Sequence, residues 1–219
     1  MRFILLGPPG VGKGTQSQRI SEYYNIPHIS TGDILRDNIA RKTELGVIAK
    51  KIIDDGNFVS DEIALNMIYQ RLQEDDTQHG YIFDGFPRTL SQAEKLEESE
   101  HGIDTIINFI LPDEACINRL SGRMTHQPSG RTYHITDNPP MEKGLDDITK
   151  EPLTKRKDDE CNTIIKRMDI FHDLTDPVID YYERNHENKF TSINADQSVD
   201  EVFENVKYAC KDMGKDQSR

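Results

Sequence analysis

The sequence predicts an α/β protein in which a five-stranded parallel sheet is covered by helices on both faces. Short apolar runs typical of buried strands alternate with longer segments of helical periodicity. Because strands joined by crossover helices pack back in the same hand, this alternation favours a mostly parallel sheet. Serine and threonine residues suited to helix capping mark where several helical segments begin.

Strand and helix segments follow one another along the chain. The predicted strands are residues 2–6, 26–29, 81–83, 105–111 and 190–193. The predicted helices are residues 13–24, 30–41, 45–54, 62–73, a helix from about residue 90, then 113–123, 161–184 and 198–210. Pro177 is expected to bend the helix over 161–184, because its ring clashes with the preceding turn. Capping-box pairs stand at Ser30 with Asp33, Thr89 with Gln92, and Ser198 with Glu201.

Composition excludes several classes of protein. The 219 residues suffice for one substantial core, or a core with a smaller appended piece. The net charge of −12, from 39 acidic and 27 basic side chains, argues against a general nucleic-acid binder, because phosphate backbones attract basic surfaces. Apolar runs stay well short of the roughly 18 residues of a membrane span. Three widely spaced cysteines indicate no disulfide framework, so we expect a cytoplasmic protein. From the charge and the short apolar runs we expect neither a nucleic-acid nor a membrane partner.

A glycine-rich loop, Gly7-Pro-Pro-Gly-Val-Gly-Lys13-Gly-Thr15, joins the first predicted strand to the first predicted helix. Glycines let backbone N–H groups turn towards phosphate oxygens, and the helix N-terminus adds partial positive charge. Lys13 supplies a point charge for the outer phosphates. Gly14 follows the lysine where the general pattern has a Mg²⁺-binding hydroxyl, so Thr15 is displaced by one position. The alternative is a tight turn that binds no ligand.

Charged side chains follow the third predicted strand. Asp84 ends that strand, at the sheet edge where open parallel sheets bind ligands. A carboxylate there can hold Mg²⁺ through water molecules. Arg88, four residues later, presents a planar set of donors for phosphate oxygens. The alternatives are an aspartate that only forms a turn and an arginine that is only solvated.

Residues 122–159 break the alternation of strands and helices. They are rich in proline, glycine and polar residues and hold no run long enough for another crossover helix. Because long loops in compact domains are usually functional, we expect an active-site lid. Four arginines lie at or near its two ends, two around its start and two around its far end: Arg119, Arg123, Arg156 and Arg167. In an acidic chain they indicate an anionic ligand, although pairing with the neighbouring Asp158 and Asp159 is an equal alternative.

Longer motifs give the chain a resemblance to the adenylate kinase family, in its long-lid form without zinc-binding cysteines. They are the glycine loop, Ser30-Thr-Gly-Asp33, Asp84-Gly-Phe-Pro-Arg88 followed by Gln92, Pro128-Ser-Gly-Arg-Thr-Tyr-His134 and Asn138-Pro-Pro140. The resemblance runs from residue 1 to residue 213. It implies one kinase domain over 1–219, with a core of 1–29, 60–121 and 160–219, an AMP-binding subdomain over 30–59 and a lid subdomain over 122–159.

The resemblance also implies roles for individual residues. The phosphates of ATP would be held by Gly10, Gly12, Lys13, Gly14 and Thr15, with Arg119 against the ATP base. AMP would be bound through its base by Thr31 and Gln92 and through its phosphate by Arg36 and Arg88. The transferring phosphoryl group would be surrounded by Arg123, Arg156 and Arg167, acting with Lys13 and Arg88. Mg²⁺ would lie near Asp33 and Asp84 through water, and Asp158 and Asp159 would help the lid to close.

Some long-lid relatives bind a structural zinc through four cysteines. The matching positions in this chain are His126, Ser129, Asp146 and Thr149. Because serine and threonine are poor zinc ligands, we expect a hydrogen-bonded polar cluster and no structural metal.

The implied reaction is reversible phosphoryl transfer from Mg-ATP to AMP, which gives two ADP and needs no covalent intermediate. We expect ATP, AMP and ADP as ligands, Mg²⁺ with ATP as cofactor, and a monomer. Thr31 and Gln92 favour AMP over UMP or CMP, since pyrimidine-specific relatives usually differ at both positions. His134 favours ATP over GTP only weakly, because GTP-dependent relatives commonly have asparagine there. A nucleotide-responsive binding module without turnover is the alternative from another class.

Overall fold

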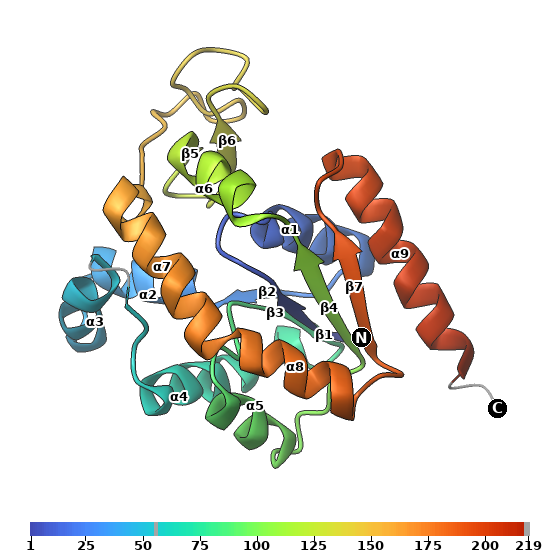
Figure 1. Cartoon of the computed structure of the whole chain (residues 1–219). Coiled ribbons are helices and arrows are strands. Elements are labelled where there is room, and N and C mark those ends of the chain that lie inside the picture. Colours follow the sequence, from blue (N-terminus) through green and yellow to red (C-terminus); the bar gives the residue numbers. More distant parts are fainter. Residues whose placement is uncertain (55–56, 217–219) are drawn as a thin grey trace.

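A five-stranded parallel sheet forms the centre of the molecule, in a computed structural model that describes residues 1–54 and 57–216 (Figure 1). Its strands are β1 (Arg2–Leu6), β2 (His28–Ser30), β3 (Tyr81–Asp84), β4 (Thr105–Ile110) and β7 (Phe190–Asn194). They lie in the order β2-β3-β1-β4-β7, with every pair parallel. The carboxyl ends of all five strands therefore meet at one edge. The predicted fold class is confirmed.

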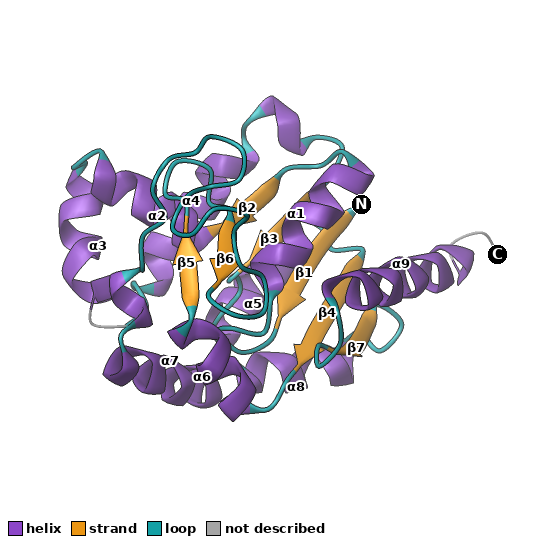
Figure 2. Ribbon diagram, turned by 90° about the horizontal axis from the view of Figure 1, so that it is seen from above, coloured by secondary structure: helices purple, strands orange, loops and turns teal. Residues whose placement is uncertain are grey.

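Helices connect the strands and cover both faces of the sheet (Figure 2). They are α1 (Lys13–Tyr24), α2 (Thr31–Ala40), α3 (Glu44–Asp54), α4 (Asp61–Leu72), α5 (Leu90–Glu97), α6 (Asp113–Ser121), α7 (Cys161–Leu174), α8 (Asp176–Asn185) and α9 (Val199–Asp216), with short 3₁₀ turns η1 (Asp75–Thr77) and η2 (Lys157–Asp159). Among the described residues, no helix combines the length and the apolar character needed to cross a membrane.

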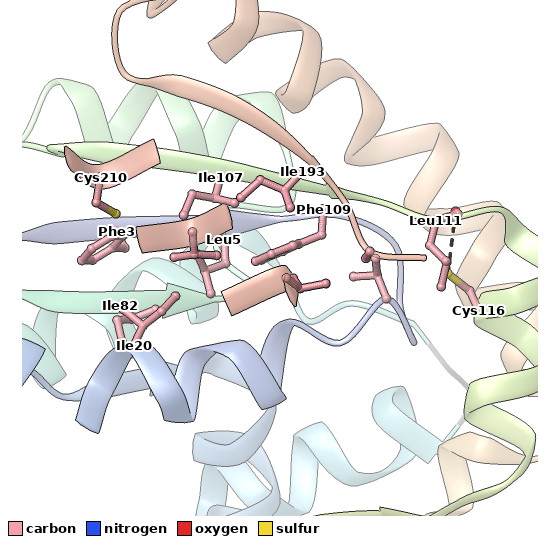
Figure 3. Packing of buried hydrophobic residues seen from close by; sticks show 14 of the residues in the cluster. Phe3, Leu5, Ile20, Ile82, Ile107, Phe109, Leu111, Cys116, Ile193 and Cys210 are labelled. Atoms are coloured by element: carbon pink, nitrogen blue, oxygen red, sulfur yellow. Dashed lines mark hydrogen bonds between the residues drawn. The ribbon is translucent and has the colours of Figure 1, made fainter. Parts of the chain in front are cut away.

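Alternate residues of the strands feed two separate cores. Phe3 and Leu5 of β1 point to one face, where they join residues of α1, α6, α7 and α9, such as Ile20 and Cys116 (Figure 3). Ile4 and Leu6 point to the other face, against α4, α5 and α8. Burying one such side chain contributes roughly 1.5–3 kcal/mol, so these two layers stabilise the sheet that carries the site.

Two of the three expected capping pairs satisfy backbone donors in only one direction. The hydroxyl oxygens of Ser30 and Thr89 accept hydrogen bonds from Asp33 N and Gln92 N, whereas the Asp33 and Gln92 side chains bond elsewhere. Ser198 and Glu201 form the reciprocal box, with Ser198 N donating to Glu201 Oε2.

Two units lie outside the sheet. Helices α2, α3 and the start of α4 enclose a small apolar core of their own, made of Leu35, Ala49, Val59, Ala64 and Met67. Residues 122–159 form the hairpin segment, in which β5 (Arg123–Thr125) pairs antiparallel with β6 (Thr132–His134). In Figure 1 this segment projects from the end of α6 and returns into α7.

Several predicted boundaries were wrong for physical reasons. Ile26 lies in the turn just after α1, where its N–H bonds to Ser21 O. The following proline has no N–H to donate, so β2 begins at His28. The helix predicted over 113–123 stops at Ser121, because Gly122 caps it and packs against the His134 ring. The segment over 122–159, expected to be a loop, contains a two-stranded sheet.

The C-terminal third also differs from prediction. The helix predicted over 161–184 is two helices, which break at Thr175. Pro177 lies in the first turn of α8, where a missing N–H costs nothing. The helix predicted to end near residue 210 continues to Asp216.

Candidate active site

The glycine loop lies between the carboxyl end of β1 and the first turn of α1. Gly7, Gly10 and Gly12 have φ of 128°, 90° and 109°, a region that residues with a side chain rarely adopt. A Cβ on Gly10 would lie 2.5 Å from the carbonyl oxygen of Cys116. Only glycine therefore lets the loop pack this closely on α6, which fixes the direction of its backbone N–H groups.

Lys13 lies folded over this loop. Its Nζ donates to the carbonyl oxygens of Gly7 at 2.6 Å and Pro8 at 2.9 Å. Burial lowers the pKa of Lys13 to about 8, and Arg88 and Arg167 push in the same direction, although the nearby Asp84 opposes them. A phosphate oxygen in the loop would offer this ammonium a stronger acceptor than two carbonyls.

Asp84 closes the neighbouring strand β3 beside the loop, as predicted. Its Oδ2 would lie 3.7 Å from a Cβ on Gly14, and it pairs with His28 Nε2 at 3.1 Å. Burial alone would raise the pKa of Asp84, but the His28 hydrogen bond and the charges of His28, Lys13 and Arg88 outweigh it and lower this pKa to about 2. The carboxylate is therefore ionised, as a ligand of hydrated Mg²⁺ must be.

A second pocket opens at the carboxyl ends of β2 and β3. Thr31 Oγ1 donates to Gly85 O at 2.8 Å, and Arg88 Nε donates to the same oxygen at 2.7 Å. Gln92 is buried in the wall of this pocket, which is also lined by Arg36. Burial, with the neighbouring charge of Arg167 next, lowers the pKa of Arg88 to about 10. Among the described residues Arg88 forms no salt bridge with a carboxylate, so its charge beside this small cavity favours an anion.

More arginines converge from the two sides of the hairpin segment. Arg123 holds Asp159 through two hydrogen bonds of 2.8 and 2.6 Å, and Arg167 contacts Asp158 Oδ2 at 3.0 Å and Asp159 Oδ1 at 3.2 Å. Pairing with local acids is thus real for these two arginines. Asp158 and Arg167 also line the same pocket as Thr31 and Arg88, so the C-terminal end of the hairpin segment and the start of α7 border this pocket.

Arg156 behaves differently from its neighbours. Among the described residues, its buried Nε has no hydrogen-bond partner, although Asp158 lies only two positions away. Burial and the positive charges of Arg36 and Arg123 lower the pKa of Arg156 to about 10. Arg36 itself pairs with Asp33 Oδ1 at 2.5 Å. Within the part of the chain that the structure describes, Arg156 therefore lies in the arginine cluster without a salt bridge, and an incoming phosphate would provide an anion.

Arg119 lies on the other side of the glycine loop. Its guanidinium donates to Val11 O at 3.2 Å and to Ala195 O, after β7, at 3.0 Å. These bonds hold the guanidinium plane between the loop and the end of the sheet.

The two other predicted loop residues lie at the start of α1. Gly12 caps the helix, and Thr15 lies in its first turn.

The four positions that replace cysteines form a polar cluster, as predicted. His126 Nδ1 lies 2.6 Å from Ser129 Oγ, and Thr149 Oγ1 lies 3.2 Å from His126 Nε2. Asp146 receives two hydrogen bonds from Arg131 at 2.9 and 2.7 Å and one from Thr149 N at 2.8 Å. Over the described residues, no group of three or more histidine, cysteine or carboxylate side chains has the geometry to hold a metal ion.

The sequence reasoning missed three residues at the site. His28 is paired with Asp84, Asp61 accepts a hydrogen bond from Gln92, and the Phe58 ring lies 4.4 Å from the Arg88 guanidinium carbon. Each lies at or just before the start of one element and contacts a residue in or next to another element. Their contacts depend on how elements pack, and sequence spacing gives no signal of that.

The glycine loop with its lysine follows the central strand of a parallel sheet, beside a carboxylate and an arginine-lined pocket. This combination is typical of phosphate-loop nucleotide kinases. A family model described as adenylate kinase matches residues 5–187. The chain belongs to the adenylate kinase family. It is a kinase of the class that reversibly transfers a phosphoryl group between ATP and AMP to give two ADP, with Mg²⁺ accompanying ATP.

Proposed function

We propose that this chain phosphorylates AMP in preference to other nucleoside monophosphates, by direct in-line transfer between the glycine loop and the arginine-lined pocket. The observation that carries the proposal is a cluster of cations drawn from separate parts of the chain. Arg88 and Arg167 line one pocket, and their charges act on Lys13. Arg156 lies within the electrostatic range of Arg36, which lines the same pocket. Phosphoryl transfer passes through a loose transition state, so catalysis needs positioned charge more than a nucleophilic side chain.

The two substrates would occupy the two sides of this space. The ATP phosphates would lie on the N–H groups of Gly10, Gly12, Gly14 and Thr15, with Lys13 on the outer phosphates and Arg119 against the base. The AMP phosphate would lie on Arg36 and Arg88, and its base on Thr31 and Gln92. An oxygen of the AMP phosphate then forms the new bond to phosphorus as the bond to the leaving ADP oxygen breaks.

Arg123, Arg156 and Arg167 would stabilise the charge that spreads over the transferred group. Asp159 and Asp158 hold Arg123 and Arg167 in place, and we assign them to closure of the site. The ionised Asp84 has its Oδ2 on His28, which leaves Oδ1 for water molecules of hydrated Mg²⁺, and Asp33 would join it. When bound, Mg²⁺ would screen the phosphate charges.

Water must be excluded, or ATP would be hydrolysed. We assign this task to two closing subdomains, residues 30–59 around AMP and residues 122–159 as the lid, with 1–29, 60–121 and 160–219 as the core. The separate small core of α2–α4 and the self-contained hydrogen bonding of the hairpin segment support the division. Family membership favours a cytosolic monomer, which light scattering at 25.1 kDa and cell fractionation would test.

The deciding experiment is a coupled assay of transfer from Mg-ATP to AMP, UMP, CMP and dAMP. We expect a strong preference for AMP in the wild type. In Lys13→Met, kcat with AMP should fall by about 10²–10³-fold, because one charge at the transition state is lost. Preference for UMP or CMP would contradict the roles of Thr31 and Gln92. ATP binding without transfer to any acceptor would replace the enzyme by a nucleotide-binding module.

A further inference from the structure

The side-chain amide of Gln92 is held from both ends. Its Oε1 accepts a hydrogen bond from Arg88 N at 2.8 Å, and its Nε2 donates to Asp61 Oδ1 at 2.7 Å. The same Asp61 oxygen also accepts from Thr89 Oγ1 at 3.0 Å. Gln92 is only 2% exposed, so the rest of its amide faces the pocket it lines or the protein interior.

These two partners allow one orientation of the amide. A backbone N–H can only donate and an ionised carboxylate can only accept, so Arg88 N selects the carbonyl end and Asp61 selects the NH₂ end. A flipped amide would place two donors together at Arg88 and two acceptors together at Asp61. In the held orientation the amide keeps one N–H and one oxygen lone pair for a ligand.

The remaining N–H and lone pair match one type of purine edge. A 6-aminopurine presents a ring-nitrogen acceptor beside an amino donor, whereas a 6-oxopurine presents a ring N–H donor beside a carbonyl acceptor. We propose that Asp61 is a specificity-determining positioning residue, which fixes the Gln92 amide so that the pocket accepts a 6-aminopurine monophosphate and disfavours a 6-oxopurine one. This rests on the proposed function, since it takes Gln92 as the group that meets the base.

Asp61 is not needed for the capping bond at the start of α4. The hydroxyl oxygen of Ser60 accepts the hydrogen bond from Ile63 N, and the acidic Glu62 also lies in that first turn. The Asp61 oxygen is instead directed at α5, through Gln92 and Thr89. Its position links the helix that borders the pocket to the residue that contacts the base.

The experiment measures kcat and KM for AMP and for IMP, the 6-oxo analogue, in wild type, Asp61→Asn and the matched control Glu62→Gln. Asparagine has the same shape but can present either an oxygen or an NH₂ group, so it tolerates both amide orientations. We expect the AMP-to-IMP ratio of kcat/KM to fall about tenfold in Asp61→Asn. The flipped Gln92 amide needed for IMP then no longer faces two acceptors at residue 61, although the mismatch at Arg88 N remains. KM for AMP rises while kcat stays within about twofold, because binding and not transfer is weakened.

Glu62→Gln should leave the ratio unchanged. If Asp61→Asn keeps the AMP-to-IMP ratio within about twofold of wild type, the inference is overturned. This holds whatever the melting temperature of the variant, because a purely structural role would affect both acceptors equally. Asp61→Ser, whose hydroxyl can donate or accept, serves in its place if the asparagine variant does not fold. Wild-type protein that transfers to neither purine overturns the proposed function and this inference together, whereas wild type that prefers AMP with an unchanged variant ratio overturns the inference alone.

Discussion

The glycine loop and the hairpin segment lie on two sides of one site, yet they are held in different ways. The loop is built from backbone that packs directly on the sheet and α6, with Gly10 against the Cys116 carbonyl. The hairpin segment is held mainly by polar side chains, with Asp146 at its centre. In the proposed mechanism the loop must cradle phosphates, which favours rigidity, whereas the hairpin segment is proposed to open and close and so needs to be stable by itself.

The sharpest test of this difference replaces a glycine in each region. Gly10→Ala places a Cβ 2.5 Å from the Cys116 oxygen at a φ of 90°, so the loop must move. We expect kcat/KM for ATP to fall about 10²-fold, because a shift of roughly 1 Å at a reacting centre has that effect. Gly130→Ala is the matched control, since Gly130 has a φ of 72° but open space around it. It should cost about 1 kcal/mol locally and leave transfer intact. Equal losses in the two variants would contradict the comparison.

The complementary change is Asp146→Asn in the hairpin segment. Neutral asparagine cannot hold Arg131 through two charge-assisted hydrogen bonds, so the segment should open more often. We expect proteolytic cleavage within residues 122–159 to become about tenfold faster, with little change in the global unfolding midpoint. Glu142→Gln, an exposed change in the same segment, is the control. A large drop in the global midpoint would mean that this segment and the sheet unfold together.

The pH dependence of transfer distinguishes the loop from its surroundings. Burial lowers the pKa of Lys13 to about 8, so the ammonium loses its proton as the pH rises through that value. Since kcat/KM reports ionisations of the free enzyme, kcat/KM for ATP should fall about fourfold between pH 7 and pH 8.5. A Lys13→Arg variant, with lower activity, should lack this alkaline limb. A flat wild-type profile to pH 9.5 would show that the Lys13 ammonium keeps its proton.

The smallest effect is expected from a conservative core change. Ile107→Val removes one methylene group from the fully buried layer beneath the loop. We expect a loss of about 1 kcal/mol in the free energy of unfolding, and a melting temperature lower by roughly 2–4 °C. Transfer and the proteolysis of the hairpin segment should not change. If proteolysis there accelerates as well, the two regions share their stability.

The sheet could be predicted because its strand segments are short, separate and bounded by clear helical segments, and three of them, residues 2–6, 81–83 and 105–111, are largely apolar. The hairpin strands could not, since β5 and β6 are three residues each and mix polar or charged side chains with apolar ones. Asp84 and Arg88 could be placed at the site because they directly follow a central strand.

Partners in the site were harder to predict than positions. Asp159 pairs with Arg123, which is 36 positions away. Arg156, only three positions from Asp159, keeps a buried nitrogen without a hydrogen bond among the described residues. The contact between Asp61 and Gln92 joins the starts of two helices. Such contacts follow from the packing of α4 on α5, which no local pattern encodes.

The most direct test of the central claim is hydrogen exchange of the backbone amides, followed by mass spectrometry, with and without a bisubstrate analogue that joins the two adenosines through phosphates. The claim is that a rigid phosphate loop works with two outer units that close. It predicts strong added protection in residues 30–59 and 122–159, modest protection at residues 7–15, and little change in β1, β4 and β7. Protection confined to residues 7–15, with unchanged exchange in both outer units, would contradict it.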